Sequence, residues 1–259
     1  MKQADSIDLN KITLSVGSHQ DRADGLCVME LAAWLAGEPH SNRPRCVSPV
    51  LVAFLRRWND DLDDGTRQLL IPYASLILNP AGDDADETRA YLATDWMVRI
   101  SVPTWLDLAG LREHAKRLRS LPPILDATGA AASLPVIVAA RDAARTGVAA
   151  NWDADMAAAA WAAARAGASA TWDAARAAGA MSAAAWDAAR AARTGAGAIL
   201  AAAAWNAARD AAARATAWDA AARAALQPTV AQLQSTIFAL LDRMIALRRM
   251  TMDDKVIKE

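Results

Sequence analysis

Between residues 139 and 226 the sequence repeats a short unit, and this stretch decides the fold. Its copies are Trp161-Ala-Ala-Ala-Arg165, Trp172-Asp-Ala-Ala-Arg176, Trp186-Asp-Ala-Ala-Arg190, Trp205-Asn-Ala-Ala-Arg209 and Trp218-Asp-Ala-Ala-Ala-Arg223. More than half of the residues in the stretch are alanine. Alanine has the highest helix propensity of all residues, and arginine is also a good helix former. The stretch is therefore predicted to be helical wherever no residue breaks it.

Glycines divide this stretch, because glycine after a basic last turn is typical of a helix end. Asn151 and Thr171 each precede Trp-Asp, which places a capping side chain before an acid in the first turn. Unequal spacing of the tryptophans favours helical hairpins of varying length over a solenoid of identical repeats. These signals predict helices over residues 136–146, 151–166, 169–178, 182–194, 198–226 and 228–252.

Within each unit, tryptophan and arginine lie four residues apart and share one helix face, except in the last copy, where they are five apart. In one interpretation the alanine faces let helices approach closely, the indoles fill the remaining space and the arginines lie at the surface. In the other, several units line one cleft, where indoles and guanidiniums bind a nucleotide-type ligand. The candidate ligand-binding residues are Trp161, Arg165, Trp172, Arg176, Trp186, Arg190, Trp205 and Arg209.

The rest of the chain also has mainly helical patterns. Helices are predicted over residues 25–36, 49–58, 66–78, 86–100, 103–109 and 111–121, with a short strand around Leu14. We therefore expect an all-α protein with three parts. Residues 1–126 form an irregular N-terminal helical module, 127–226 an array of antiparallel helices, and 227–259 an amphipathic helix with a charged tail.

The C-terminal helix carries an apolar stripe with alternating steps of three and four residues. Its members are Val230, Leu233, Ile237, Leu240, Met244 and Leu247. This spacing is typical of a heptad seam. The stripe either packs on the chain's own bundle or forms a homodimer through residues 228–250.

Overall composition restricts the classes of partner. The net charge of -1 argues against generic nucleic-acid binding and against an anionic membrane surface. Two cysteines are typical of a reducing compartment rather than of a disulfide framework. No signal peptide is expected, and the longest apolar run is far shorter than the ~20 residues that span a bilayer. We expect a cytoplasmic protein without a membrane segment.

Five potential metal ligands lie within the first 46 residues: His19, Cys27, Glu30, His40 and Cys46. Zinc accepts nitrogen, sulfur and oxygen ligands of these types. Their spacings match no standard ligand pair, so packing and helix capping are the alternative roles. The sequence has no Gly-rich phosphate loop, no Gly-x-Ser-x-Gly motif and no His-Glu-x-x-His motif. A non-enzymatic protein is therefore expected, with no cofactor other than this possible zinc ion.

Several N-terminal motifs occur together. They are Gly17-Ser-His19, Asp24-Gly-Leu-Cys-Val-Met-Glu30, Ala36-Gly-Glu-Pro-His40, Pro44-Arg-Cys-Val-Ser-Pro49, Trp58-Asn-Asp60, Asp95-Trp-Met-Val-Arg99 and Pro103-Thr-Trp-Leu-Asp-Leu-Ala-Gly-Leu111. Over residues 15–125 the chain resembles a family of uncharacterised proteins of actinobacteria and their bacteriophages. In composition, the alanine-rich stretch is similar to immunity proteins. These resemblances imply a phage or mobile-element accessory protein that acts by binding.

Three functions remain open from the sequence. The preferred one is a non-catalytic interaction protein that binds a protein partner, of host or toxin origin, through a helical surface. The second is a binder that sequesters a small nucleotide-type ligand, such as a defence signal, in the Trp/Arg cleft. The third is a metal-dependent enzyme at the N-terminal His/Cys/Glu cluster.

Overall fold

The computed structural model describes residues 7–78, 83–108, 110–147 and 217–256, and within them the protein is all-α, as predicted. Beyond the helices, an isolated β-bridge joins Val47 to Leu78. The helices predicted over residues 151–166, 169–178 and 182–194, most of the one predicted over 198–226, and the four tryptophans and four arginines proposed to bind a ligand lie outside the described residues.

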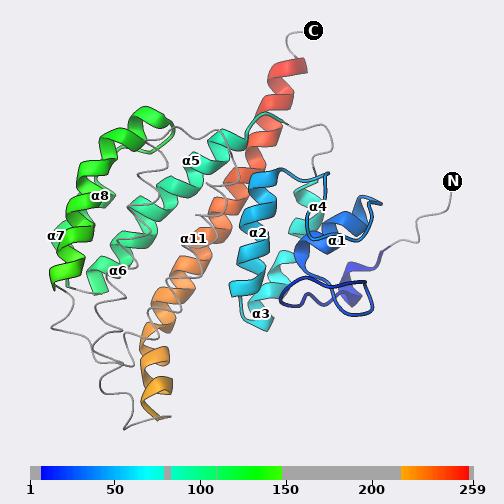
Figure 1. Cartoon of the computed structure of the whole chain (residues 1–259), viewed down its shortest axis with the longest axis horizontal. Helices are drawn as coiled ribbons and strands as arrows, with labels where there is room; N and C mark the ends of the chain where they lie inside the picture. Colours follow the sequence, from blue (N-terminus) through cyan, green and yellow to red (C-terminus); the bar gives the residue numbers. More distant parts are fainter. Residues whose placement is uncertain (1–6, 79–82, 109, 148–216, 257–259) are drawn as a thin grey trace.

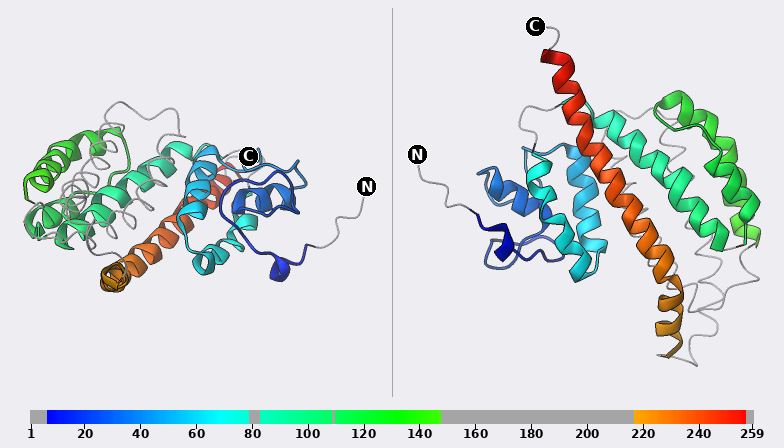
Figure 2. Two further views of the ribbon diagram at one scale, coloured as in Figure 1. Left: turned by 60° about the horizontal axis from the view of Figure 1, so that its bottom comes forward. Right: turned by 180° about the vertical axis from the view of Figure 1, so that it is seen from behind.

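A long C-terminal helix passes between two groups of shorter helices (Figures 1 and 2). On one side are α1 to α4, and on the other are α5 to α8. In chain order the elements are a 3-10 turn Leu9–Lys11, α1 Val28–Leu35, α2 Pro49–Asp61, α3 Asp64–Arg67, a 3-10 turn Gln68–Leu70, α4 Tyr73–Leu76, α5 Asp86–Trp96, a π-helical turn Met97–Ser101, α6 Val102–Leu108, α7 Arg112–Arg119, α8 Ala127–Gly147 and α11 Ala217–Val256.

The apolar stripe of α11 packs inside the chain. The buried residues of this helix are Leu226, Leu233, Ile237, Leu240, Leu241 and Met244. Side chains from both helix groups contact α11: Trp96 of α5 donates its Nε1–H to Thr236 at 3.0 Å, and the Trp58 ring of α2 meets Phe238 edge to face at 6.4 Å. The stripe is therefore a core seam of this chain, and a homodimer through residues 228–250 would need another face of the helix.

By length and composition, the segment Leu226–Leu247 of α11 would also suffice to cross a membrane. A core helix of a water-soluble protein passes the same test, and this segment supplies part of the core described above.

Residues 66–78, predicted as one helix, form three short pieces instead. Pro72 interrupts the ladder because proline has no N–H to donate. The Arg67 guanidinium turns inward and donates to the carbonyl oxygens of Asn59 and Leu62, at 2.8 and 2.5 Å. These bonds fix the corner between α2 and α3, which a helix-propensity argument does not predict.

The two helices predicted over 86–100 and 103–109 are joined by the π-helical turn. Pro103 has no N–H to donate, and in a regular α-helix its ring would clash with the carbonyl four residues earlier. The wider π turn accommodates the proline ring. The Thr104 hydroxyl donates to the Ile100 carbonyl at 2.7 Å. Helix α6 therefore continues in the direction of α5.

Described helices on either side of the predicted domain boundaries share one hydrophobic core, and the division into three parts stays a prediction. Helix α8 begins at Ala127 and continues through Pro135, and α11 runs through Pro228 without ending. Ile137 of α8 and Leu233 of α11 belong to the same core cluster as the N-terminal helices. Residues on both sides of positions 126 and 226 thus share one core.

The strand predicted around Leu14 does not form. The backbone is extended there, but the Gln68 side chain accepts from the Leu14 N–H at 2.8 Å and donates to its carbonyl at 3.0 Å. The alternating pattern does not predict burial here, because Leu14 is 2% exposed whereas Val16, which the pattern places on the same face, is 56% exposed. A side-chain amide replaces the partner strand that the pattern suggested.

Candidate functional site

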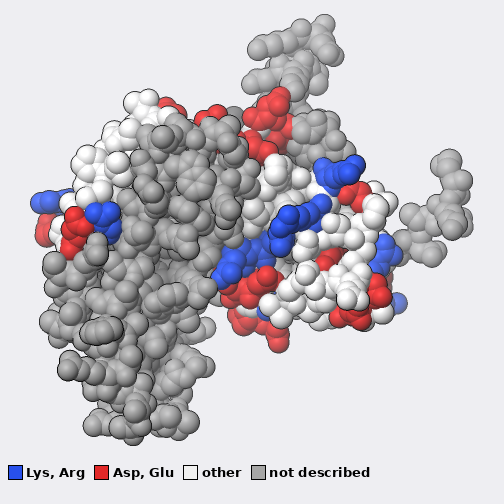
Figure 3. Space-filling model, in the orientation of Figure 1, with Lys and Arg blue, Asp and Glu red and all other residues white. Residues whose placement is uncertain are grey.

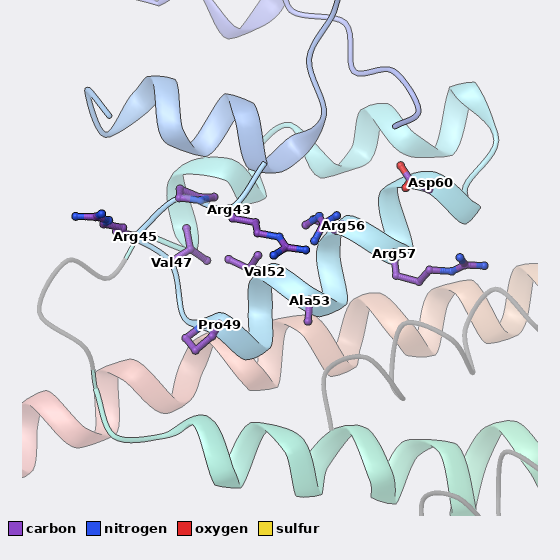
Figure 4. A pocket seen from close by; sticks show the side chains of 10 residues that line it. Arg43, Arg45, Val47, Pro49, Val52, Ala53, Arg56, Arg57 and Asp60 are labelled. Carbon is purple, nitrogen blue, oxygen red and sulfur yellow. The ribbon is translucent and has the colours of Figure 1, made fainter. Parts of the chain in front are cut away.

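Four arginines line one hollow beside α2. The hollow has a volume of about 850 Å³ and is bounded by α2 and the segment that precedes it. Its lining residues are Arg43, Pro44, Arg45, Val47, Pro49, Val52, Ala53, Arg56, Arg57 and Asp60 (Figure 4). We call this hollow the arginine groove.

The local sequence explains why the arginines gather there. Ser48 caps α2 by accepting from the Leu51 N–H at 3.3 Å, and Pro49 occupies the first turn, so the helix starts directly after the Arg43–Arg45 segment. The inward face of α2 buries Val50, Phe54 and Trp58, as the four-residue spacing predicted. Arg56 and Arg57 consequently fall outside that face and lie beside the preceding segment.

Three of the four arginines have no acidic partner among the described residues. Arg57 pairs with Asp61, Nε to Oδ2, at 2.9 Å. Arg43, Arg45 and Arg56 form no ion pair with any carboxylate in the part of the chain that the structure describes. Figure 3 shows Lys and Arg side chains in a band across this face, with acidic side chains at one end.

The floor of the groove is apolar. Val47 is 4% exposed and Val52 8%, Pro44 is buried, and Ala53 is half-buried. The groove therefore combines a hydrophobic floor with cationic walls. Asp60, at one end, is already engaged, because its Oδ1 accepts from the Gly17 N–H at 2.8 Å.

A buried polar cluster surrounds Glu30. Its carboxylate accepts from the backbone N–H of His19 at 2.8 Å, from His19 Nδ1 at 2.7 Å and from the backbone N–H of Cys27 at 2.8 Å. Burial opposes ionisation, but the Cys27 and His19 donors outweigh it and hold the pKa of Glu30 below its ordinary value of 4.5. Glu30 is thus an ionised carboxylate at neutral pH.

The two histidines in this cluster make different contacts. His19 Nε2 lies 2.9 Å from the Ser15 hydroxyl. His40 Nε2 donates to the His19 carbonyl at 3.2 Å and lies 3.8 Å from Glu30 Oε1. The loop that carries His40 is therefore held against the loop that carries His19 by direct polar contacts.

The five predicted metal ligands are only partly brought together. His19, Glu30 and His40 meet, and Cys27 joins them through its backbone N–H and a side-chain hydrogen bond to Glu30, whereas Cys46 lies beside Glu38. Burial raises the pKa of Cys27 to about 12, and burial with the nearby Glu38 carboxylate raises that of Cys46 to about 11. In the described residues, no group of three or more His, Cys, Asp or Glu side chains is arranged to hold a metal ion.

Sequence reasoning missed the groove and one member of the polar cluster. The pairs Arg43-Pro-Arg45 and Arg56-Arg57 are visible in the sequence, the first shortly before the predicted helix over residues 49–58 and the second near its end. Ser15 has no such signal, because only the fold brings its hydroxyl to His19. No protein-family model, curated protein or solved structure matches the chain. The N-terminal family resemblance therefore stays a prediction.

Proposed function

We propose that this chain is a binding protein whose arginine groove takes a small phosphate-bearing ligand of nucleotide size without acting on it chemically. The observation that carries the proposal is that Arg43, Arg45 and Arg56, none of which has a carboxylate partner in the part of the chain that the structure describes, line one hollow. The sequence suggested a nucleotide-type ligand at the Trp/Arg units, whereas this proposal places such a ligand in the arginine groove.

Charge favours a multivalent anion. Guanidiniums around one hollow repel each other, and a bound anion both removes that repulsion and supplies hydrogen-bond acceptors. Arginine presents a planar set of donors that matches phosphate oxygens two at a time. A diphosphate or triphosphate concentrates the charge that Arg43, Arg45 and Arg56 can neutralise.

Size and polarity favour a small ligand over a polymer. Ligand pockets have volumes of about 300–1,000 Å³ and mostly apolar walls with a few polar groups. The groove, at about 850 Å³, falls within this size range, and Val47 and Val52 belong to its apolar floor. Asp60 places a negative charge at one end, which disfavours a long nucleic acid continuing past it.

This proposal fits the role implied by the N-terminal resemblance. An accessory protein that sequesters a nucleotide-type signal must bind its ligand tightly but need not catalyse a reaction. It would bind this ligand in the cytoplasm. A protein partner with an acidic segment is the competing occupant of the same groove, and the experiment below separates the two.

Titration calorimetry on the full chain tests the proposal. The titrants are ATP, inorganic triphosphate, adenosine and a hexaglutamate peptide. We expect heat from the two phosphate compounds and none from adenosine. A double variant, Arg43→Gln with Arg56→Gln, should bind ATP about 100-fold more weakly, because each charged hydrogen bond contributes about 1.5–3 kcal/mol.

The matched control replaces Arg112 and Arg117, two exposed arginines of α7, with glutamine, and should bind ATP like the wild type. Absence of heat from both phosphate compounds overturns the proposal. Stronger binding of hexaglutamate than of ATP overturns it as well, and makes the groove a protein-docking surface.

A further inference from the structure

A chain of hydrogen bonds outside the groove joins Ser15, His19 and Glu30. Ser15 Oγ lies 2.9 Å from His19 Nε2, and His19 Nδ1 lies 2.7 Å from Glu30 Oε2. The three side chains come from a loop, a turn and helix α1, so only the fold brings them together. The proposed ligand groove uses none of them.

The direction of these bonds follows from the ionised Glu30. A carboxylate only accepts hydrogen bonds, so His19 Nδ1 carries the proton that it shares with Glu30. In the neutral imidazole the other nitrogen, Nε2, is then an acceptor. The Ser15 hydroxyl lies 3.4 Å from the Leu26 carbonyl oxygen and 2.9 Å from Nε2, so it donates to the closer Nε2, which is the arrangement in which a histidine can take a serine proton.

The backbone around Ser15 is fixed on both sides. Its N–H donates to the Leu26 carbonyl at 2.8 Å, and its own carbonyl accepts from Asn59 Nδ2 at 2.9 Å. Asn59 is fully buried. The serine residue as a whole is half-buried, so it keeps a solvent-facing surface. A rigid, partly accessible serine is the geometry that nucleophilic catalysis requires.

Gly25 makes room for this relay. A Cβ at position 25 would lie 2.6 Å from His19 Cδ2 and 2.7 Å from both His19 Nε2 and Ser15 Oγ. The Gly25 φ of +140° is also a conformation that other residues rarely adopt. The glycine thus packs directly against the hydrogen bond between serine and histidine.

We propose that Ser15 is an activated nucleophile that accepts an acyl group from a reactive ester, with His19 as its general base and Glu30 as the residue that orients the imidazole. Ser15 Oγ forms a bond to the ester carbonyl carbon while its proton moves to His19 Nε2. The bond from that carbon to the alcohol oxygen breaks, and the alcohol leaves with the proton from His19. Water then hydrolyses the Ser15 ester by the same proton route, releasing the acid.

The test uses two probes on the full chain, a fluorophosphonate and 4-nitrophenyl acetate. With the fluorophosphonate, an Oγ–phosphorus bond forms, the phosphorus–fluorine bond breaks, and fluoride leaves. We expect one adduct per chain, located on Ser15 by peptide mass spectrometry, and a burst of nitrophenol from the ester. Unfolding the chain in urea should abolish labelling, because the relay exists only in the folded protein.

Variants distinguish reactivity from a purely structural role. Ser15→Ala should remove the adduct, His19→Gln should slow labelling at least about 100-fold, and Glu30→Gln at least about tenfold. The control Ser18→Ala, an exposed serine three residues away, should label like the wild type. No adduct on the folded wild type, or an adduct on another residue, overturns the proposal whatever the variants do. Labelling retained in folded His19→Gln also overturns it.

Discussion

Arg89 and the arginines of the groove carry the same guanidinium group, but their surroundings differ in burial and in ion pairing. Arg89, on α5, is 1% exposed and donates to both carboxylate oxygens of Asp83, to Asp86 at 3.0 Å and to the Met244 carbonyl of α11 at 3.0 Å. Burial alone would lower its pKa, but the ion pairs with Asp83 and Asp86 outweigh burial and raise it. Arg43, Arg45 and Arg56 have no carboxylate partner in the described structure.

The difference separates arginines that hold the fold from arginines available to a ligand. Arg89 has its donors bound within the chain and ties α5 to α11. The groove arginines contribute cationic charge without such internal partners. Replacing Arg89 should lower the stability of the fold, whereas replacing a groove arginine should change ligand binding alone.

The largest effect is expected from Arg89→Met. Breaking a buried ion pair costs about 3–5 kcal/mol, because Asp83, at 6% exposure, would keep a charge without its counterion. Urea unfolding followed by circular dichroism measures the loss, with Arg56→Met as the matched control. Adding Asp83→Asn to Arg89→Met should recover part of the stability. A loss below about 1 kcal/mol would show that Arg89 is no more structural than the groove arginines.

Glu30→Gln should cost about 3 kcal/mol at neutral pH, since Glu30 accepts three hydrogen bonds as a buried charge. Because the folded pKa lies below 4.5, this stabilisation is complete above that value and is lost as the pH falls through the folded pKa. The stability difference between wild type and variant should therefore shrink on acidification.

Urea unfolding at a series of pH values measures this difference. Glu113→Gln is the control, because Glu113 is also in the first turn of a helix but is exposed. A wild-type advantage over Glu30→Gln that grows on acidification contradicts the assigned ionisation state.

Gly25→Ala should cost about 2 kcal/mol more than Gly37→Ala. Both glycines have a positive φ, but a Cβ at position 37 meets nothing within 4 Å, whereas one at position 25 overlaps the Ser15–His19 contact. Thermal and urea unfolding of the two variants give the comparison. Equal losses would mean that the serine and histidine move aside freely, and would remove the argument for a rigid relay.

The smallest effect on stability is expected from Arg45→Gln. Its side chain is exposed and forms no ion pair within the described chain, so the free energy of unfolding should stay within about 0.5 kcal/mol of the wild type. Affinity for ATP should nevertheless fall about tenfold, because one charged donor is lost. A stability loss as large as that of Arg89→Met would place Arg45 with the structural arginines.

The sequence predicted what depends on local periodicity and missed what depends on long-range contact. The helical class and the buried face of α2 follow from residue spacing alone. The helical passage through Pro135 and Pro228 does not, because packing on neighbouring helices overrides the local cost of proline. The short strand around Leu14 was predicted in error, since periodicity cannot show that Gln68 would take the partner's place.

For the candidate site, the sequence correctly grouped His19, Glu30 and His40, but it suggested that they bind a common metal ion. The Glu30 carboxylate accepts from His19, and His40 donates to the His19 carbonyl oxygen, so the three side chains do not face a common centre. The arginine groove depends on how the segment before α2 lies along that helix, and no local pattern encodes that path.

The most direct test measures unfolding free energy for the wild type and for the double variant Arg43→Gln, Arg56→Gln, each with and without ATP. Without ligand, the double variant should be as stable as the wild type or slightly more stable, because repulsion between guanidiniums is relieved. With ATP at about 100 times its dissociation constant, the wild type should gain about 2.7 kcal/mol, and the variant should gain almost nothing. A double variant that is destabilised by more than about 1 kcal/mol without ligand, or that gains as much from ATP as the wild type, would contradict the account.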